Sequence, residues 1–100
     1  MSYSLQVLYP AENTKFDFDY YTTKHMEIVG SAIGPQIEKT VITRGAPGPD
    51  GKLSHHAIAT ILFADQAQFE AAMASLGPAV QDIPNFYDGQ PDVVAGQVIG

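Results

Sequence analysis

The sequence is 100 residues long, with 45% hydrophobic and 16% charged residues, so we expect a single small globular domain over residues 1–100. Eleven acidic side chains against five basic ones give a formal charge of −6, which argues against a nucleic-acid partner and against an anionic membrane surface, because both require concentrated positive charge. The absence of cysteine excludes disulfides, thiolate metal sites and a cysteine nucleophile.

Membrane insertion and export are not indicated either. Met1–Pro10 has no basic segment and runs directly into a strand pattern, unlike a signal peptide. No apolar run approaches the ~20 residues that a membrane span needs. We therefore expect a cytoplasmic protein.

The first strand and the first helix follow each other closely. Hydrophobic alternation over Tyr3–Tyr9 predicts a strand, and Pro10–Asn13 a loop. Asp17 is a suitable N-cap for a helix that Gly34 and Pro35 would end. At about 100° per residue, one helix face carries Phe18, Tyr21, Thr22, His25, Ile28, Val29, Ala32 and Ile33. The opposite face carries Asp19, Tyr20, Thr23, Lys24, Glu27 and Ser31.

His25 interrupts the apolar face of this helix. It is either a core imidazole bonded to a backbone carbonyl or a tyrosine, or a proton-transfer or ligand-contacting group that lines a cavity under the helix. Tyr21 lies one turn earlier, so phenol and imidazole can face the same space. A neutral imidazole can accept a proton near neutral pH, and a phenol can hydrogen-bond a developing enolate or phenolate oxygen.

Two further strands are predicted in the middle of the chain. Gln36–Arg44 carries branched residues typical of a strand. The glycine- and proline-rich segment Gly45–Gly51 predicts a long, mobile hairpin loop. His55–Phe63 is apolar on both faces after its two histidines, which indicates a central strand covered on both sides.

The second helix is predicted to begin after Asp65, with Gln68 as capping-box partner, and to end at Gly77 and Pro78. Its inward residues are Phe69, Ala72, Met73 and Leu76.

The rest of the chain leads to a last strand. Pro78–Asp82 is expected to form at most one more helical turn, and Ile83–Gln90 to be irregular. Asp92–Ile99 is predicted as the final strand, with apolar residues on both faces.

The element order βαββαβ predicts an α+β, ferredoxin-like fold with two helices on one face of a four-stranded sheet. The third and fourth strands are apolar on both faces, so a single chain would expose a large apolar surface. We therefore expect a homodimer in which two sheets pack face to face.

The sequence resembles the EthD family, named for ethyl tert-butyl ether degradation. The resemblance lies in Leu8-Tyr9-Pro10, in FDFDYYTTKHMEIV over residues 16–29, in the strand ending at Phe63, and in PNFYDGQP over residues 84–91. It implies a dimeric α/β barrel of ferredoxin-like protomers. That superfamily includes cofactor-independent monooxygenases, muconolactone isomerases and polyketide cyclases, along with haem-binding and stress-response relatives.

The resemblance also implies a cleft lined by the first helix, with His25 and Tyr21 as its acid/base pair and Tyr87 closing its mouth. We add Tyr9, Phe18 and His55 as candidate substrate contacts. His55 and His56 are adjacent on a strand and point to opposite faces, so which of them reaches the cleft stays open.

No metal or other cofactor is expected. The histidines lack a carboxylate at a diagnostic metal-binding spacing, and a small protomer leaves little room for a haem at His25.

Two functions remain open. One is a cofactor-independent enzyme that binds a small hydrophobic or aromatic substrate and uses His25 for proton transfer. The other is a non-catalytic accessory or binding protein, which sequesters an intermediate or supports an oxidative, cytochrome P450-type system for ether or xenobiotic degradation.

Overall fold

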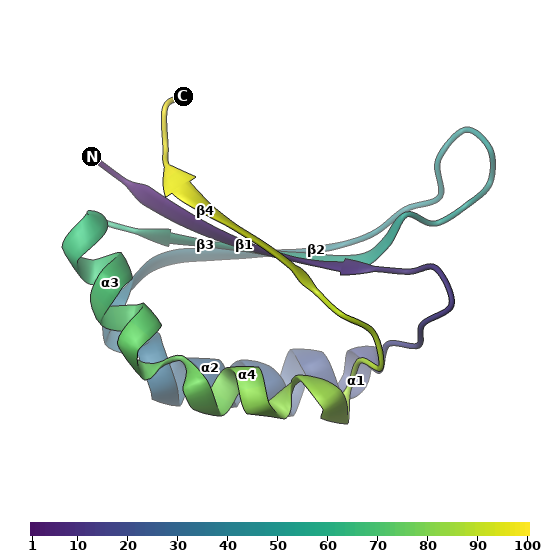
Figure 1. Cartoon of the computed structure of the whole chain (residues 1–100), viewed down its shortest axis with the longest axis horizontal. Helices are drawn as coiled ribbons and strands as arrows, with labels where there is room; N and C mark the ends of the chain where they lie inside the picture. The colour runs from purple at the N-terminus through teal and green to yellow at the C-terminus, as the bar shows by residue number, and fades with distance from the viewer.

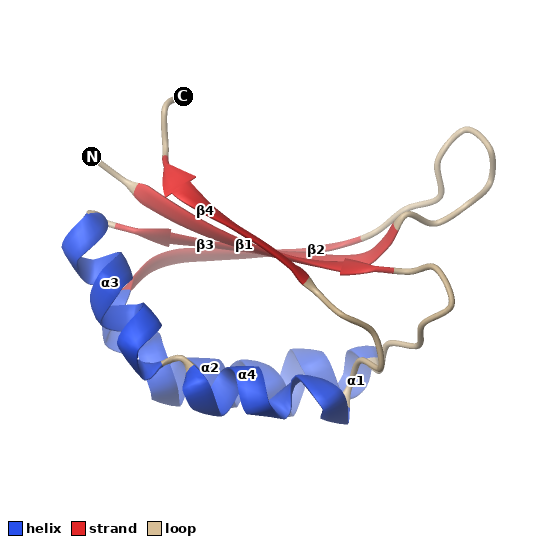
Figure 2. Cartoon of the chain, in the orientation of Figure 1, coloured by secondary structure: helices blue, strands red, loops and turns tan.

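The computed structural model describes residues 1–100 as a four-stranded antiparallel sheet with helices on one face only (Figures 1 and 2). The sheet order is β2-β3-β1-β4, and the strands are β1 (Tyr3–Pro10), β2 (Ile37–Arg44), β3 (His55–Phe63) and β4 (Asp92–Gln97). The predicted βαββαβ order and the α+β, ferredoxin-like fold are confirmed.

The first helix is not the single regular helix that the sequence predicts. It comprises α1 (Phe18–Tyr20), a π-helical turn (Tyr21–His25), α2 (Met26–Ile33) and a 3-10 turn (Gly34–Gln36). The N-cap prediction is confirmed, because a side-chain oxygen of Asp17 accepts a hydrogen bond from the Tyr20 amide at 3.1 Å.

The second helical segment is longer than predicted. It consists of α3 (Gln66–Ser75), α4 (Gly77–Asp82) and a 3-10 turn (Ile83–Asn85). Asp65 caps α3 by accepting from the Gln68 amide at 2.9 Å, as expected. Pro78 stands in the first turn of α4, where its missing amide hydrogen costs nothing. The expected short turn is therefore a separate helix, which carries Asp82 at its C-terminal end.

The core lies between the sheet and the helices, in two clusters. The first surrounds Leu5, Ile33 and Phe63, which are almost fully buried. The second, which we call the aromatic cluster, lies at the other end of the sheet and consists of Tyr9, Tyr21, Phe16, Phe18, Phe86 and Tyr87 with Ala57. It joins the N-terminal part of the first helix to the segment that precedes β4, where Phe16 and Tyr87 form an isolated bridge.

The face of the sheet opposite the helices is uncovered in the single chain (Figure 1). On β3, alternate residues such as Ala59 and Ile61 are buried under the helices, whereas Ile58, Thr60 and Leu62 face the other way and are half-buried. On this face Gln6 Nε2 donates a hydrogen bond to Thr60 Oγ1 at 3.3 Å. The sequence predicts a β3 covered on both faces. Within this chain only the face toward the helices is covered.

The last strand and the loop between β2 and β3 differ from their sequence-based bounds by more than one residue. β4 ends at Gln97 rather than Ile99, although the Val98 amide still donates to Ser2 O at 2.9 Å. The loop between β2 and β3 runs from Gly45 to Ser54 and extends away from the rest of the chain (Figure 1).

Candidate functional site

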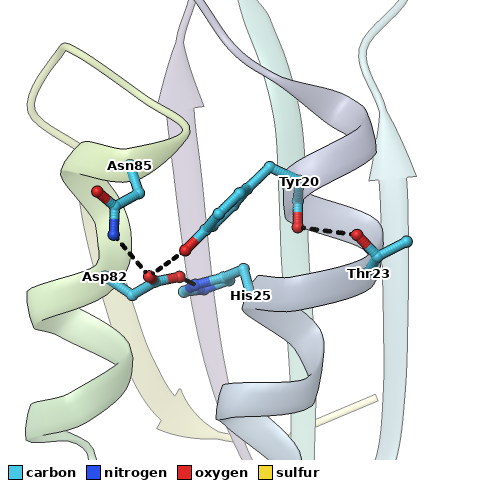
Figure 3. Close-up of polar contacts among 5 residues, drawn as sticks. All are labelled: Tyr20, Thr23, His25, Asp82 and Asn85. Atoms are coloured by element: carbon cyan, nitrogen blue, oxygen red, sulfur yellow. Dashed lines mark hydrogen bonds and ion pairs between the residues drawn. The ribbon is translucent and has the colours of Figure 1, made fainter.

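Three side chains converge on the carboxylate of Asp82 at the C-terminal end of α4 (Figure 3). Tyr20 Oη donates to Asp82 Oδ1 at 2.6 Å, and Asn85 Nδ2 donates to the same oxygen at 2.9 Å. His25 Nδ1 lies 2.9 Å from Oδ2. Both Asp82 and His25 are buried, at 7% and 4% exposure. A buried carboxylate requires such partners, because leaving water without them is costly.

The protonation state of this pair follows from its contacts. Burial acts to raise the pKa of Asp82, but the hydrogen bonds from Tyr20, Asn85 and His25 outweigh it, and the pKa lies below its usual value. Burial lowers the pKa of His25, against the opposing hydrogen bond and charge of Asp82. At neutral pH the carboxylate is therefore ionised and the imidazole neutral. Because a carboxylate only accepts, the imidazole proton is on Nδ1.

The other ring nitrogen of His25, Nε2, carries the free lone pair. Nε2 has no hydrogen-bond partner in the protein. It is nevertheless not fully buried, because the one fully buried side-chain polar atom without a partner is Oε1 of Gln36. His25 lines a cavity of about 50 Å³ between the sheet and the helices α2 and α4. Twelve of its thirteen lining residues are hydrophobic, and His25 is the exception. Such an apolar setting strengthens any hydrogen bond or charge interaction made there.

Tyr9 and Tyr21 line the same cavity. Burial raises the pKa of Tyr21 to about 12. Burial, together with the neighbouring Tyr21 hydroxyl, raises the pKa of Tyr9 even further. Both phenols therefore keep their protons and can donate hydrogen bonds. The Tyr21 ring stacks on the His25 ring, with centroids 5.4 Å apart and an interplanar angle of 18°, so the contact between them is between ring faces.

The structure divides the predicted site residues into two groups. Tyr9, Tyr21 and His25 share the cavity. Phe18 and Tyr87 lie on the far side of the aromatic cluster, along a surface groove of about 530 Å³. The Tyr87 hydroxyl donates to Pro10 O at 2.8 Å.

In the same groove the Arg44 guanidinium lies 4.2 Å from the centroid of the Phe18 ring, a cation–π contact.

The two histidines of β3 also separate. His55 lies beside Ser54, with Nδ1 3.1 Å from Ser54 Oγ, and no contact places it at the cavity. His56 stacks on Phe16, and its Nε2 lies 2.9 Å from Thr14 Oγ1. An irregularity in the pairing of β1 with β3 occurs at this point. Of the two, His56 is therefore the one that contacts the aromatic cluster.

Asp82, Tyr20 and Asn85 were not among the residues that the sequence singled out. Tyr20 was assigned to the solvent face of a regular helix, and this is wrong because its hydroxyl reaches Asp82. Asp82 is 57 residues from His25, and no motif links them. A carboxylate two residues before Pro84 was the one local signal.

No group of three or more His, Cys, Asp or Glu side chains lies close enough together to hold a metal ion. The structure also contains no helix long and apolar enough to cross a membrane.

Solved structures resemble this chain over nearly its whole length. An EthD-like protein from Ralstonia eutropha JMP134 is 25% identical, with 99% of this chain and 93% of that chain covered and a TM-score of 0.86. A dimeric ferredoxin-like protein from an uncultured marine organism is 14% identical, with coverage of 99% and 96% and a TM-score of 0.65. SnoaB, a cofactor-independent oxygenase from Streptomyces nogalater, is 10% identical, with coverage of 99% and 94% and a TM-score of 0.62. The last two likenesses show the fold alone.

No curated protein sequence matches the chain. The EthD domain model, however, matches residues 10–90, which include the first helix, the central strand and the segment around Asp82. This match covers most of the chain and agrees with the motifs of the first helix and of residues 84–91. The chain belongs to the EthD family.

Proposed function

We propose that this protein is a cofactor-independent enzyme that removes a proton from a small apolar substrate, with His25 as general base. The observation that carries the proposal is the His25–Asp82 pair at an apolar cavity: Nδ1 is bonded to Asp82, His25 lines the cavity, and Nε2 is left without a hydrogen-bond partner. Membership of the EthD family and likeness to a cofactor-independent oxygenase support a small-molecule-binding or enzymatic role.

The proposed chemistry uses only residues of this chain. Nε2 of His25 takes a proton from a carbon next to a carbonyl group, so that the C–H bond breaks and its electron pair moves to the carbonyl oxygen as an enolate. Asp82 stabilises the imidazolium that forms. The Tyr21 hydroxyl, and Tyr9 beside it, donate hydrogen bonds to the enolate oxygen. A substrate with an apolar, aromatic skeleton and an acidic C–H group fits this lining.

The size of the cavity sets a condition on this function. A volume of about 50 Å³ holds one or two water molecules, whereas ligand sites typically measure roughly 300–1,000 Å³. Substrate entry therefore requires movement of the lining. Val80 of α4, at 53% exposure, is the one exposed residue among those that line the cavity, so this side of the lining meets solvent.

The same small volume favours one alternative. A non-catalytic accessory protein of an oxidative, cytochrome P450-type degradation system would need no substrate cavity, and the contacts of Asp82 would then serve to hold α4 against the first helix. The two functions differ in whether His25 exchanges protons with a ligand.

Deuterium incorporation tests the proposal without knowledge of the natural substrate. Purified protein is incubated in deuterated buffer with 2-indanone, 2-tetralone or anthrone, and exchange at the carbon next to the carbonyl is followed by NMR. We expect exchange above the buffer rate, and a loss of ~10²-fold or more in His25→Gln and Asp82→Asn. His56→Gln, which lies outside the cavity, is the matched control. Equal exchange by wild type and His25→Gln would contradict the proposal.

A further inference from the structure

We propose that Tyr20 is a positioning residue for His25, and that the π-helical turn between them exists to aim both side chains at Asp82. This proposal rests on the proposed function. It identifies what fixes the orientation of the general base, and it concerns a residue that does not touch the cavity.

The π-helical turn brings Tyr20 and His25 to the same side of the helix. Tyr20 and His25 are five residues apart, and in a regular α-helix such residues lie about 140° apart around the axis, too far to meet one neighbour. In a π-helical turn the hydrogen bonds run between residues five apart, which brings such residues onto nearly the same side. The Met26 amide makes such a bond to the Tyr21 carbonyl. The extra residue thus places the Tyr20 hydroxyl and the His25 imidazole over the same carboxylate (Figure 3).

The two oxygens of Asp82 accept hydrogen bonds from different donors. Tyr20 and Asn85 both bind Oδ1, at 2.6 Å and 2.9 Å, so Oδ2 is left to His25. Asp82 is the last residue of α4, close to the C-terminal end of this helical segment, where the helix dipole disfavours a negative charge. Without the Tyr20 hydroxyl, Oδ1 keeps only the hydrogen bond from the exposed Asn85 side chain, and the carboxylate can rotate or move toward solvent.

The tautomer of the His25 imidazole follows from these hydrogen bonds. The tautomer of a neutral histidine is set by the hydrogen bond that one of its nitrogens makes. With Oδ2 held in place, the proton stays on Nδ1 and the lone pair on Nε2 faces the cavity. When Asp82 is free to turn, the proton can move to Nε2, and His25 ceases to be a base toward the cavity.

Nitrogen NMR of the imidazole rings tests this directly and needs no substrate. At pH 8 we expect wild-type His25 to show a protonated Nδ1 and an unprotonated Nε2. Tyr20→Phe should shift both signals toward the average of mixed tautomers. Tyr20→Met removes the hydroxyl in a second way, in case the first variant folds poorly. Tyr3→Phe is the matched control, because the Tyr3 ring packs against Phe69 in the other core cluster.

The deuterium-exchange assay supplies the second measurement. Tyr20→Phe should slow exchange by about tenfold or more, as loss of alignment in a catalytic group does, while Tyr3→Phe should not. An unchanged His25 tautomer in a folded Tyr20→Phe variant would overturn the positioning role, even if His25→Gln abolishes exchange. Mixed tautomers in Tyr20→Phe, with exchange unaffected by any His25 variant, would keep the positioning role and reject the proposed reaction.

Discussion

Tyr20 and His25 are hydrogen-bonded to opposite oxygens of one carboxylate, Asp82, at 2.6 Å and 2.9 Å. This contact ties the N-terminal part of the first helix to the end of α4, beside the apolar cavity that His25 lines. It has two roles that experiments can separate. It holds two helical segments together, and it fixes which nitrogen of His25 carries the proton.

The structural role predicts a measurable coupling between His25 and Asp82. His25→Leu leaves Oδ2 of a buried carboxylate without a donor, so we expect a loss of about 1–3 kcal/mol in the free energy of unfolding. A double-mutant cycle with Asp82→Leu should give a coupling energy of about 0.5–3 kcal/mol by urea denaturation. Stability that stays at the wild-type level in His25→Leu would show that the pair does not hold the fold.

Stability should fall on acidification in two stages. The pKa of His25 in the folded protein lies below its ordinary 6.5, so between these values the unfolded chain binds the proton and the folded one does not. The stabilisation from neutral His25 is therefore complete above pH 6.5 and is lost as the pH falls toward the folded value. Asp82, whose pKa lies below 3.8, adds a second loss at lower pH. Urea denaturation of wild type and His25→Gln checks this, since the variant should lack the first stage.

Proton transfer by His25 predicts a specific pH–rate profile. Exchange should rise with pH through the pKa of His25, which lies below 6.5, and then stay level, because the neutral imidazole is the active form. A decline is expected only as Tyr21 loses its proton near pH 12. A profile that instead falls between pH 6 and 8 would assign the reaction to an acid rather than to this base.

The uncovered face of the sheet predicts a homodimer. Ile58 and Leu62 lie on it next to polar Gln6 and Thr60, and no helix of the chain reaches it. Analytical ultracentrifugation at micromolar concentration should show a dimer for the wild type. Leu62→Lys, which places a charge in that interface, should shift it toward monomer. The control Val80→Lys, at an exposed position of α4, should leave the dimer unchanged. A monomeric wild type would refute the prediction.

The loop Gly45–Lys52 should tolerate shortening. It projects from the sheet, and its glycines and prolines supply turns but no apolar anchor (Figure 1). Because loop entropy changes slowly with length, we expect less than about 1 kcal/mol of change in stability on thermal denaturation. A loss above ~2 kcal/mol would mean that the loop packs on another part of the molecule.

Local patterns in the sequence are enough to predict the fold class and the approximate bounds of the strands. The alternation in β1 and β3 and the capping residues Asp17 and Asp65 are local signals, because they depend on neighbours within a few residues. His25 as the polar residue of an apolar face also followed from periodicity alone. So did the uncovered sheet face, since two helices cannot cover both sides.

The partners of His25, by contrast, depend on how distant segments pack together. The pairing of His25 with Asp82 joins residues 57 apart, and depends on how α4 lies against the first helix. The inward place of Tyr20 depends on one π-helical turn, which an assumed period of 3.6 residues misses. Which strand histidine meets the aromatic cluster depends on an irregular register at the start of β3. Burial follows the periodic spacing of hydrophobic residues, so it can be predicted from the sequence. The direction of a single polar side chain is set by packing between distant segments, which the sequence does not reveal.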